Sequence, residues 1–326
     1  MNLCTDSPRC AEAWFSAVPG WTSGLPEGLP REFRDIVQRL LPDDSLVTAT
    51  VDLPWPWNHV VFVEHAGRSQ FDVLVRALRE GCAIPDGLVC LAGSGEGFHG
   101  QRGRAWAAIQ GNLHLSVFLS PTAFRTDVPA ACHLNDIATG LTVLPAASLV
   151  QTLDSMPGLK HRAGIRWVND IVIDGSKLAG YLVHTQSSAG TVTGAVIGIG
   201  LNMEAVPSVA PTAFVPSVTA LRDHLADARF CSRSDLLRRF LHILGVNYGR
   251  LLAGRAGELL EVYRRHSVVV GRYVEVYPDL EGEVLRHSAA GTVAAIGDRL
   301  ELIFAEGGRP VSAGRLVMAS GVGAHI

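Results

Sequence analysis

Apolar residues follow strand and helix periods in turn through the middle of the chain. Strands are expected at 59–64, 87–92, 112–119, 171–174, 178–184 and 191–199. After the first strand, Phe71, Leu74, Val75 and Leu78 recur at the spacing of one helical face. Further helices are expected at 130–144, 146–156, 233–252 and 256–266. This mixture predicts one α+β domain over residues 56–266.

The two flanking regions have different patterns. Residues 1–55 are rich in proline and tryptophan, with one helix expected at 32–41, and they lack the helix pattern of a winged helix-turn-helix. Residues 267–326 contain short strand-like runs separated by turn residues such as Gly297-Asp298. These runs lie at 273–276, 282–286, 291–296 and 300–304. We expect an N-terminal extension before the central domain and a small β-barrel after it.

Composition and charge exclude several classes of protein. The 326 residues are 48% hydrophobic and 18% charged, whereas disordered chains combine low hydrophobicity with high charge. Lysine and arginine total 28 against 31 aspartate and glutamate, so the chain lacks the positive excess typical of nucleic-acid binders. No apolar run approaches the roughly 18 residues of a membrane span, and the first residues show no signal-peptide pattern. A cytoplasmic protein with no DNA or membrane partner is therefore expected.

Cysteine and histidine spacing gives no sign of a bound metal. The six cysteines form no C-x-x-C pair, and no histidines stand at the spacing of zinc ligands. We expect reduced thiols and no metal held by the protein itself.

Glycine, arginine and tryptophan are concentrated in residues 92–106, which follow an apolar strand and are called the glycine loop below. Glycines let backbone amides approach an anion, arginines pair with phosphate or carboxylate, and an indole can cover a base. The loop is therefore interpreted as a nucleotide cradle. Gly95, Gly97 and Gly100 also match the dinucleotide-binding fingerprint, but that fingerprint requires a helix where 112–119 is strand-like. A surface turn without a ligand is the other alternative.

A second segment, residues 166–180, brings a carboxylate near an ammonium group. Asp174-Gly175 is a hairpin signal, so Asp170 and Lys177 are expected on neighbouring strands at one end of the sheet. Lys177 is one of only two lysines among 28 basic residues, which favours a functional need for an ammonium group. The alternative is a cross-strand ion pair that only holds the hairpin and contributes about 0.2–1 kcal/mol.

A third segment is the apolar strand that ends at Asn202. An asparagine amide can donate and accept hydrogen bonds at once, which suits the edge of a purine. A buried strand with a turn-forming asparagine is the alternative.

In this order and spacing, the three segments resemble those of the biotin protein ligase family. The family's Gly-Arg-Gly-Arg-x-Gly-Arg-x-Trp and Gly-x-Asn-Leu-x-x-Ser sequences correspond to Phe98-His-Gly-Gln-Arg-Gly-Arg-Ala-Trp106 and Gly111-Asn-Leu-His-Leu-Ser116. Its Lys-Trp-Pro-Asn-Asp, Lys-Leu-Ala-Gly-Ile and Ile-Gly-Ile-Gly-Ile-Asn sequences correspond to Arg166-Trp-Val-Asn-Asp170, Lys177-Leu-Ala-Gly-Tyr181 and Ile197-Gly-Ile-Gly-Leu-Asn202. The likeness spans about residues 58–320.

The resemblance implies a fold and a reaction. The fold is a mixed sheet with flanking helices, similar to class II aminoacyl-tRNA synthetases, followed over residues 267–326 by an SH3-like β domain. In the reaction, the carboxylate of biotin attacks the α-phosphorus of ATP and gives biotinyl-5'-AMP and pyrophosphate. A lysine of a biotin carboxyl-carrier protein then takes the biotin and releases AMP. Mg²⁺ is expected to accompany ATP, and a homodimer is an open expectation.

The resemblance also implies roles for individual residues. Lys177 would neutralise the reacting carboxylate and phosphate, and Asp170 would orient or deprotonate the incoming lysine amine. Arg104 would hold phosphate, Trp106 would cover adenine and Asn202 would contact the base edge. The residues expected to bind the nucleotide are Gly100, Arg102, Gly103, Arg104, Trp106, Asn169 and Asn202. The residues expected near biotin and its carboxylate are Gly95, His99, Gln101 and Gly180.

The chain departs from the family's pattern in the glycine loop. His99 and Gln101 stand where the family has its first two loop arginines. Gly95 stands where the family has a glutamine that helps to hold the biotin head group, and Glu96 follows it. The adenylate-forming frame is therefore better supported than biotin itself. A ligase for lipoate, octanoate or another small carboxylate is one alternative, and a regulatory protein that binds biotin or its adenylate without transferring it is another.

Overall fold

The computed structural model describes residues 1–16, 18–41, 46–121, 134–278 and 287–318, except the side chains of 134–136 and 228. Within these ranges, ten strands form one mixed sheet and four form a second sheet. The strands of the large sheet are β1 (Asn2–Thr5), β2 (Thr22–Ser23), β3 (Val47–Thr50), β4 (His59–Ala66), β5 (Leu88–Gly95), β6 (Leu113–Leu119), β7 (Ala163–Arg166), β8 (Asp170–Ile173), β9 (Ser176–Ser188) and β10 (Thr191–Leu201). Their order is β2-β3-β1-β4-β5-β6-β10-β9-β8-β7.

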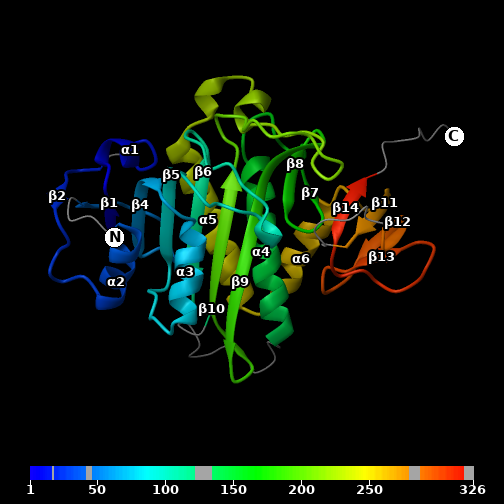
Figure 1. Cartoon of the computed structure of the whole chain (residues 1–326), viewed down its shortest axis with the longest axis horizontal. Coiled ribbons are helices and arrows are strands. Elements are labelled where there is room, and N and C mark those ends of the chain that lie inside the picture. Colours follow the sequence, from blue (N-terminus) through cyan, green and yellow to red (C-terminus); the bar gives the residue numbers. More distant parts are fainter. Residues whose placement is uncertain (17, 42–45, 122–133, 279–286, 319–326) are drawn as a thin grey trace.

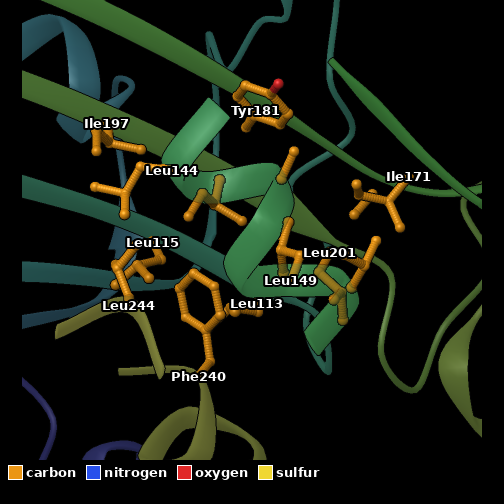
Figure 2. Close-up of a cluster of buried hydrophobic side chains, with 14 of the residues drawn as sticks. Leu113, Leu115, Leu144, Leu149, Ile171, Tyr181, Ile197, Leu201, Phe240 and Leu244 are labelled. Carbon is orange, nitrogen blue, oxygen red and sulfur yellow. The ribbon is translucent and has the colours of Figure 1, made fainter. Parts of the chain in front are cut away.

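Helices cover both faces of the large sheet. They are α1 (Pro8–Glu12), α2 (Arg31–Leu40), α3 (Gln70–Arg79), α4 (Leu134–Asp154), α5 (Arg233–Leu252) and α6 (Ala256–Arg265). The larger of two hydrophobic clusters joins α4, α5 and α6 to one face of the sheet, and the smaller one joins α2 and α3 to the other. Figure 2 shows part of the larger cluster, in which Leu144 on α4 and Phe240 on α5 lie near Leu113, Leu115 and Ile197 from the sheet.

The first residues add strands to one edge of the large sheet. Strand β1 pairs in parallel with β4 and antiparallel with β3, and β3 pairs with β2. The pairs β1·β4 and β4·β5 are parallel and the remaining pairs of this sheet are antiparallel. The expected helix at 32–41 is present as α2, but the sequence analysis did not predict β1–β3 or α1.

Helix α4 joins two segments that were expected to be separate helices. It continues through Pro145, because its apolar side chains are buried against the sheet, α5 and α6. Proline removes only one backbone hydrogen bond, which such packing can offset. The window Ile137–Asp154 is long and apolar enough to span a membrane, with a mean hydropathy of 1.2, but 67% of it is buried inside the protein. This burial is typical of a core helix. The expected helical residues 130–133 lie outside the described residues.

The small sheet forms one end of the molecule, opposite the N-terminal strands (Figure 1). Its strands are β11 (Tyr273–Tyr277), β12 (Ala289–Ile296), β13 (Leu302–Phe304) and β14 (Arg315–Met318), in the antiparallel order β13-β12-β11-β14. The expected strands at 273–276, 291–296 and 300–304 are confirmed, and the one at 282–286 lies outside the described residues. The sequence analysis missed β14.

Candidate active site

Side chains along β6 and β10 alternate between the two faces of the large sheet. One face packs into the large hydrophobic cluster, and the other carries the candidate site. In β6, Leu113 and Leu115 belong to the large hydrophobic cluster, so His114 and Ser116 point to the other face. In β10, Gly198 and Gly200 alternate in the same way with apolar residues of that cluster. Glycines at these positions leave the sheet without side chains there, which gives a shallow floor on which another group can lie.

Aromatic rings occupy part of this floor. A Cβ atom on Gly200 would lie 2.3 Å from Cε2 of Trp106, and one on Gly198 would lie 2.9 Å from the Phe71 ring. Both distances are shorter than an ordinary Cβ contact, so a larger residue at either position would displace the ring. The Nε1 atom of Trp106 is buried and has no hydrogen-bond partner among the described residues. A buried donor without a partner is costly, and a ligand oxygen would satisfy it.

A buried carboxylate holds two cations beside this floor. The hairpin predicted at Asp174-Gly175 joins β8 to β9, and it brings Lys177 Nζ to 2.6 Å from Asp170 Oδ1. Arg166 Nη2 lies 2.7 Å from Asp170 Oδ2. Burial alone would raise the pKa of Asp170, but the charges and hydrogen bonds of Lys177 and Arg166 outweigh it and lower the pKa below its ordinary value. Asp170 is therefore ionised at neutral pH.

The glycine loop folds back on itself above the floor. The Trp106 amide donates to the Phe98 carbonyl over 2.9 Å, and the Gly100 amide donates to the Arg104 carbonyl over 2.7 Å. At the tip, Arg102 and Gly103 have φ values of +58° and +73°. Glycine adopts this left-handed conformation freely, whereas arginine does so at a cost.

His99 anchors the glycine loop to helix α3. Its Nε2 atom lies 3.0 Å from both carboxylate oxygens of Asp72, and its Nδ1 atom lies 2.9 Å from the Gly100 carbonyl. The hydrogen bond to Gly100 is the largest factor that raises the pKa of His99, and the Asp72 carboxylate adds to it. His99 thus links the glycine loop to α3 through Asp72.

His114 forms a neutral part of the wall. Burial lowers its pKa to about 4, and its Nε2 atom lies 3.0 Å from the Ile109 carbonyl, so this nitrogen carries the proton. The side chain packs edge-on against Phe98, with ring centroids 5.7 Å apart. Near the floor, the site thus combines uncharged and aromatic surfaces, which suit an apolar portion of a ligand.

Two adjoining cavities lie over the floor. The first has a volume of about 180 Å³ and extends over the glycine floor, and the second has about 210 Å³ and includes Asn202 and Val209. Trp106, Lys177 and Arg315 line both cavities and therefore separate them. The Lys177 Nζ atom lies 5.8 Å from the Trp106 ring centroid, so a cation stands where the two cavities meet.

Asn202 is held tightly at the second cavity. Its Nδ2 atom donates to the Thr219 carbonyl over 3.1 Å, and its Oδ1 atom lies 3.5 Å from Asn112 Nδ2. The Oδ1 atom of Asn112 accepts the backbone amides of 203, 204 and 205. These two asparagines fix the chain that turns out of β10 into the wall of the second cavity.

The chain at the start of β14 also reaches the site, where Gly314, Arg315 and Leu316 line the first cavity. Arg315, the first residue of β14, lines both cavities, and its guanidinium carbon lies 3.6 Å from the Phe214 ring centroid. Phe214 in turn packs edge-on against Tyr277 of β11, with ring centroids 5.6 Å apart. The segment that follows Asn202 is thus joined to the small sheet by stacked side chains.

Most of the residues predicted from the sequence lie around these cavities. The first cavity is lined by His99, Gly100, Gln101, Arg104, Trp106, Asn169, Asp170, Lys177 and Gly180. Asn202 lines only the second. Gly95, Arg102 and Gly103 line neither. Glu96 faces solvent, with its side chain 79% exposed and 4.0 Å from His65.

Sequence reasoning did not select Arg166 or Arg315 as site residues. Arg166 stands four residues before Asp170 in a segment already singled out, so its charge was a usable signal. Arg315 lies in the small sheet, and nothing in its sequence neighbourhood points to the site. With these two residues, the lining of the first cavity includes the cationic side chains of Arg104, Arg166, Lys177 and Arg315 and one carboxylate, Asp170. The excess positive charge favours an anionic ligand.

Comparisons with known proteins bear on the family to which the chain belongs. Residues 83–202 match the family model described as Biotin/lipoate A/B protein ligase family. A biotin--[acetyl-CoA-carboxylase] ligase of Mycobacterium tuberculosis (strain ATCC 25618 / H37Rv) is 30% identical over 289 residues, which cover 87% of this chain and 98% of that protein. The bifunctional ligase/repressor BirA of Bacillus subtilis (strain 168) is 30% identical over 138 residues, which cover 42% of this chain and 39% of BirA.

A solved structure agrees at the level of the fold. The biotin protein ligase from Aquifex aeolicus in complex with biotin and ATP matches with a TM-score of 0.55 at 17% identity, covering 80% of this chain and 99% of that one. The family model and the Mycobacterium tuberculosis relative thus define a ligase of the biotin/lipoate class. Within that class, the chain belongs to the biotin protein ligase family.

Proposed function

We propose that the protein is an ATP-dependent biotin protein ligase that forms biotinyl-5'-AMP and transfers biotin to a lysine of a carrier protein. The observation that carries this proposal is the position of Lys177 where the two cavities meet. One cavity suits an acid with an apolar body, and the other suits a nucleotide base. A cation between them would neutralise the carboxylate and the α-phosphate as they approach. The membership of the family and the ATP and biotin complex of the Aquifex aeolicus relative support the same reaction.

The first step joins the acid to AMP. A carboxylate oxygen of biotin attacks the α-phosphorus, a P–O bond forms, and the bond to the leaving pyrophosphate breaks. Lys177, Arg104 and Arg315 would stabilise the negative charge that develops on the phosphate oxygens, since all three line the first cavity. The Nε1–H of Trp106 would donate to a ligand oxygen, and its ring would cover the bound molecule.

The second step transfers the acyl group to an amine. The carrier lysine attacks the acyl carbon, AMP leaves, and the amine loses one proton. We assign Asp170 to orienting this amine. Its lowered pKa makes Asp170 a weak base. Its main role would therefore be to attract and hydrogen-bond the incoming lysine rather than to remove a proton from it.

Mg²⁺ would arrive with the ATP phosphates. Among the described residues that line either cavity, Asp170 is the one carboxylate; it lies in the first cavity, and Lys177 and Arg166 already bind it. A magnesium ion prefers several oxygen ligands and keeps its waters, so the residues present fit an ion held mainly by phosphate and water.

The proposal also covers the division of the chain into regions, its location and its oligomeric state. We propose residues 1–55 as an extension of the sheet without a DNA-binding role, 56–266 as the catalytic domain and 267–326 as an SH3-like domain. A cytoplasmic location and a homodimer belong to the same proposal. The net charge of −3 supports the absence of a DNA partner.

Pyrophosphate exchange measured with a panel of acids tests the proposal. Purified full-length protein, Mg²⁺ and ATP should exchange labelled pyrophosphate in the presence of biotin, and a biotin carboxyl-carrier domain should then become labelled at its lysine. Exchange with lipoate or octanoate but not with biotin would assign the alternative substrate. Tight binding of biotin without labelling of the carrier would identify a regulatory protein instead.

A further inference from the structure

Three side chains that could bind a metal meet at the far end of β7, outside the active site. Asp154 is the last residue of α4, His161 lies in the connection to β7, and His266 directly follows α6. Their side-chain donor atoms all lie within 4.8 Å of one another.

The distances suit shared coordination of one ion. Asp154 Oδ2 lies 3.1 Å from His266 Nε2 and 3.6 Å from His161 Nδ1. Ligand atoms bonded to zinc at about 2.0–2.2 Å in a tetrahedral arrangement are about 3.3–3.5 Å apart. Two of the three separations are therefore close to those around one tetrahedral ion, and the third, between His161 and His266, is within 4.8 Å.

A hydrogen bond fixes the tautomer of His266. Its Nδ1 atom lies 2.9 Å from the Val262 carbonyl, which has no proton to give, so Nδ1 must carry the proton. In a neutral ring, the lone pair of Nε2 then faces the Asp154 carboxylate oxygen. Two acceptors at 3.1 Å repel each other unless a proton or a metal ion lies between them. Histidines that bind a metal through one ring nitrogen usually donate a hydrogen bond from the other nitrogen, as Nδ1 of His266 does to Val262.

The connection before β7 holds the other two groups in place. The backbone amide of His161 donates to Asp154 Oδ1 over 2.8 Å, which leaves Oδ2 directed at the histidines. His161 has a φ of +61°, a conformation that costs energy for any residue other than glycine. Its side chain is 73% exposed, whereas those of Asp154 and His266 are 19% and 12% exposed. Two of the three side chains are thus mostly shielded from solvent, and the third is on the solvent side, where water can complete the coordination.

We propose that Asp154, His161 and His266 bind a divalent cation of the zinc type. Two imidazoles and one carboxylate suit Zn²⁺ and similar borderline ions, whereas Mg²⁺ and Ca²⁺ prefer oxygen ligands only.

The ion would join the catalytic sheet to the start of the C-terminal domain. The Ile165 amide of β7 donates to the His266 carbonyl over 2.7 Å, and the Val268 amide donates to Ile165 over 3.0 Å. The chain enters the small domain directly after these residues. A bound ion should therefore stabilise this junction, because it binds the folded arrangement and not the unfolded chain.

Zinc titration of the full-length protein, freed of metal with a chelator, tests the proposal. Wild type should bind Zn²⁺ and show a higher melting temperature with it, and Co²⁺ in its place should give visible absorption typical of nitrogen and oxygen ligands. His161→Ala should weaken this binding at least about tenfold and abolish the shift in melting temperature. His242→Ala removes an exposed histidine of α5 and should bind as wild type does.

Asp154→Asn gives a second, nearly isosteric test. Its amide oxygen can still accept the His161 amide, so the turn should persist while the metal loses a charged ligand. If wild type binds no Zn²⁺, or if His161→Ala and Asp154→Asn both bind it as wild type does, the three residues form only an ion-paired cluster and the proposal is wrong. Zinc bound at cysteines would be equal in all variants and would not affect the comparison.

Discussion

The role assigned to Lys177 can be tested by its replacement with alanine. The side chain is 20% exposed, and its ammonium lies 2.6 Å from Asp170 at the boundary of the two cavities. If this charge stabilises the transition state of adenylation, its removal should lower the rate by about 10²–10³-fold, or about 2.7–4 kcal/mol, as for a single preorganised oxyanion donor. Biotin-dependent pyrophosphate exchange at saturating ATP measures this rate directly.

The same substitution has a smaller expected effect on folding. Asp170 keeps its second partner, Arg166, at 2.7 Å, so the carboxylate is not left unpaired. One lost charged hydrogen bond should cost about 1.5–3 kcal/mol, which a thermal melt detects separately from activity. Lys160→Ala removes the only other lysine, an exposed one, and serves as the matched control. Exchange within about twofold of wild type in the Lys177 variant would refute the assignment.

Three further predictions concern other parts of the site. Arg315→Ala should raise the KM for ATP at least about tenfold and the KM for biotin less, and equal increases would contradict its placement at the phosphates. Gly200→Ala should displace Trp106, because the added Cβ would meet the ring at 2.3 Å; binding of biotin should weaken, and unchanged affinity would show that the indole does not touch the acid. Because the pKa of His99 is raised above 6.5, its ion pair with Asp72 stabilises the glycine loop at low pH and is lost as the pH rises through the raised pKa. Hydrogen exchange of the loop, corrected for intrinsic rates, should therefore be slower at pH 6 than at pH 8.5 in wild type but not in Asp72→Asn.

The central strands and helices could be predicted because each is long and periodic. Helix α5 begins and ends where the pattern placed it, and β4, β6 and β10 lie within a few residues of their expected bounds. The short strands β1, β2 and β3 could not be predicted in the same way. They have two to four residues each, too few to show a period, and they form because a long sheet edge is available for pairing.

The site could be predicted where local sequence fixes local geometry. The Asp174-Gly175 turn places β8 beside β9 and so brings Asp170 near Lys177, although the register shifts between Ile171 and Val172 and Asp170 pairs with Gly180. Arg315 lies in the small sheet, and no local sequence pattern predicts that this sheet packs beside the cavities. The proposed metal-binding residues could not be predicted from short sequence spacings either, because His266 stands 112 positions after Asp154.

Gly95 bears on how this ligase could have come to differ from its relatives. A Cβ atom there would lie 2.5 Å from both the Ala66 carbonyl oxygen and the Phe98 ring, so the backbone itself occupies the space that a side chain would need. A larger residue at this position would require β4 and the glycine loop to move apart. Recognition of the acid must therefore depend on other atoms of the site.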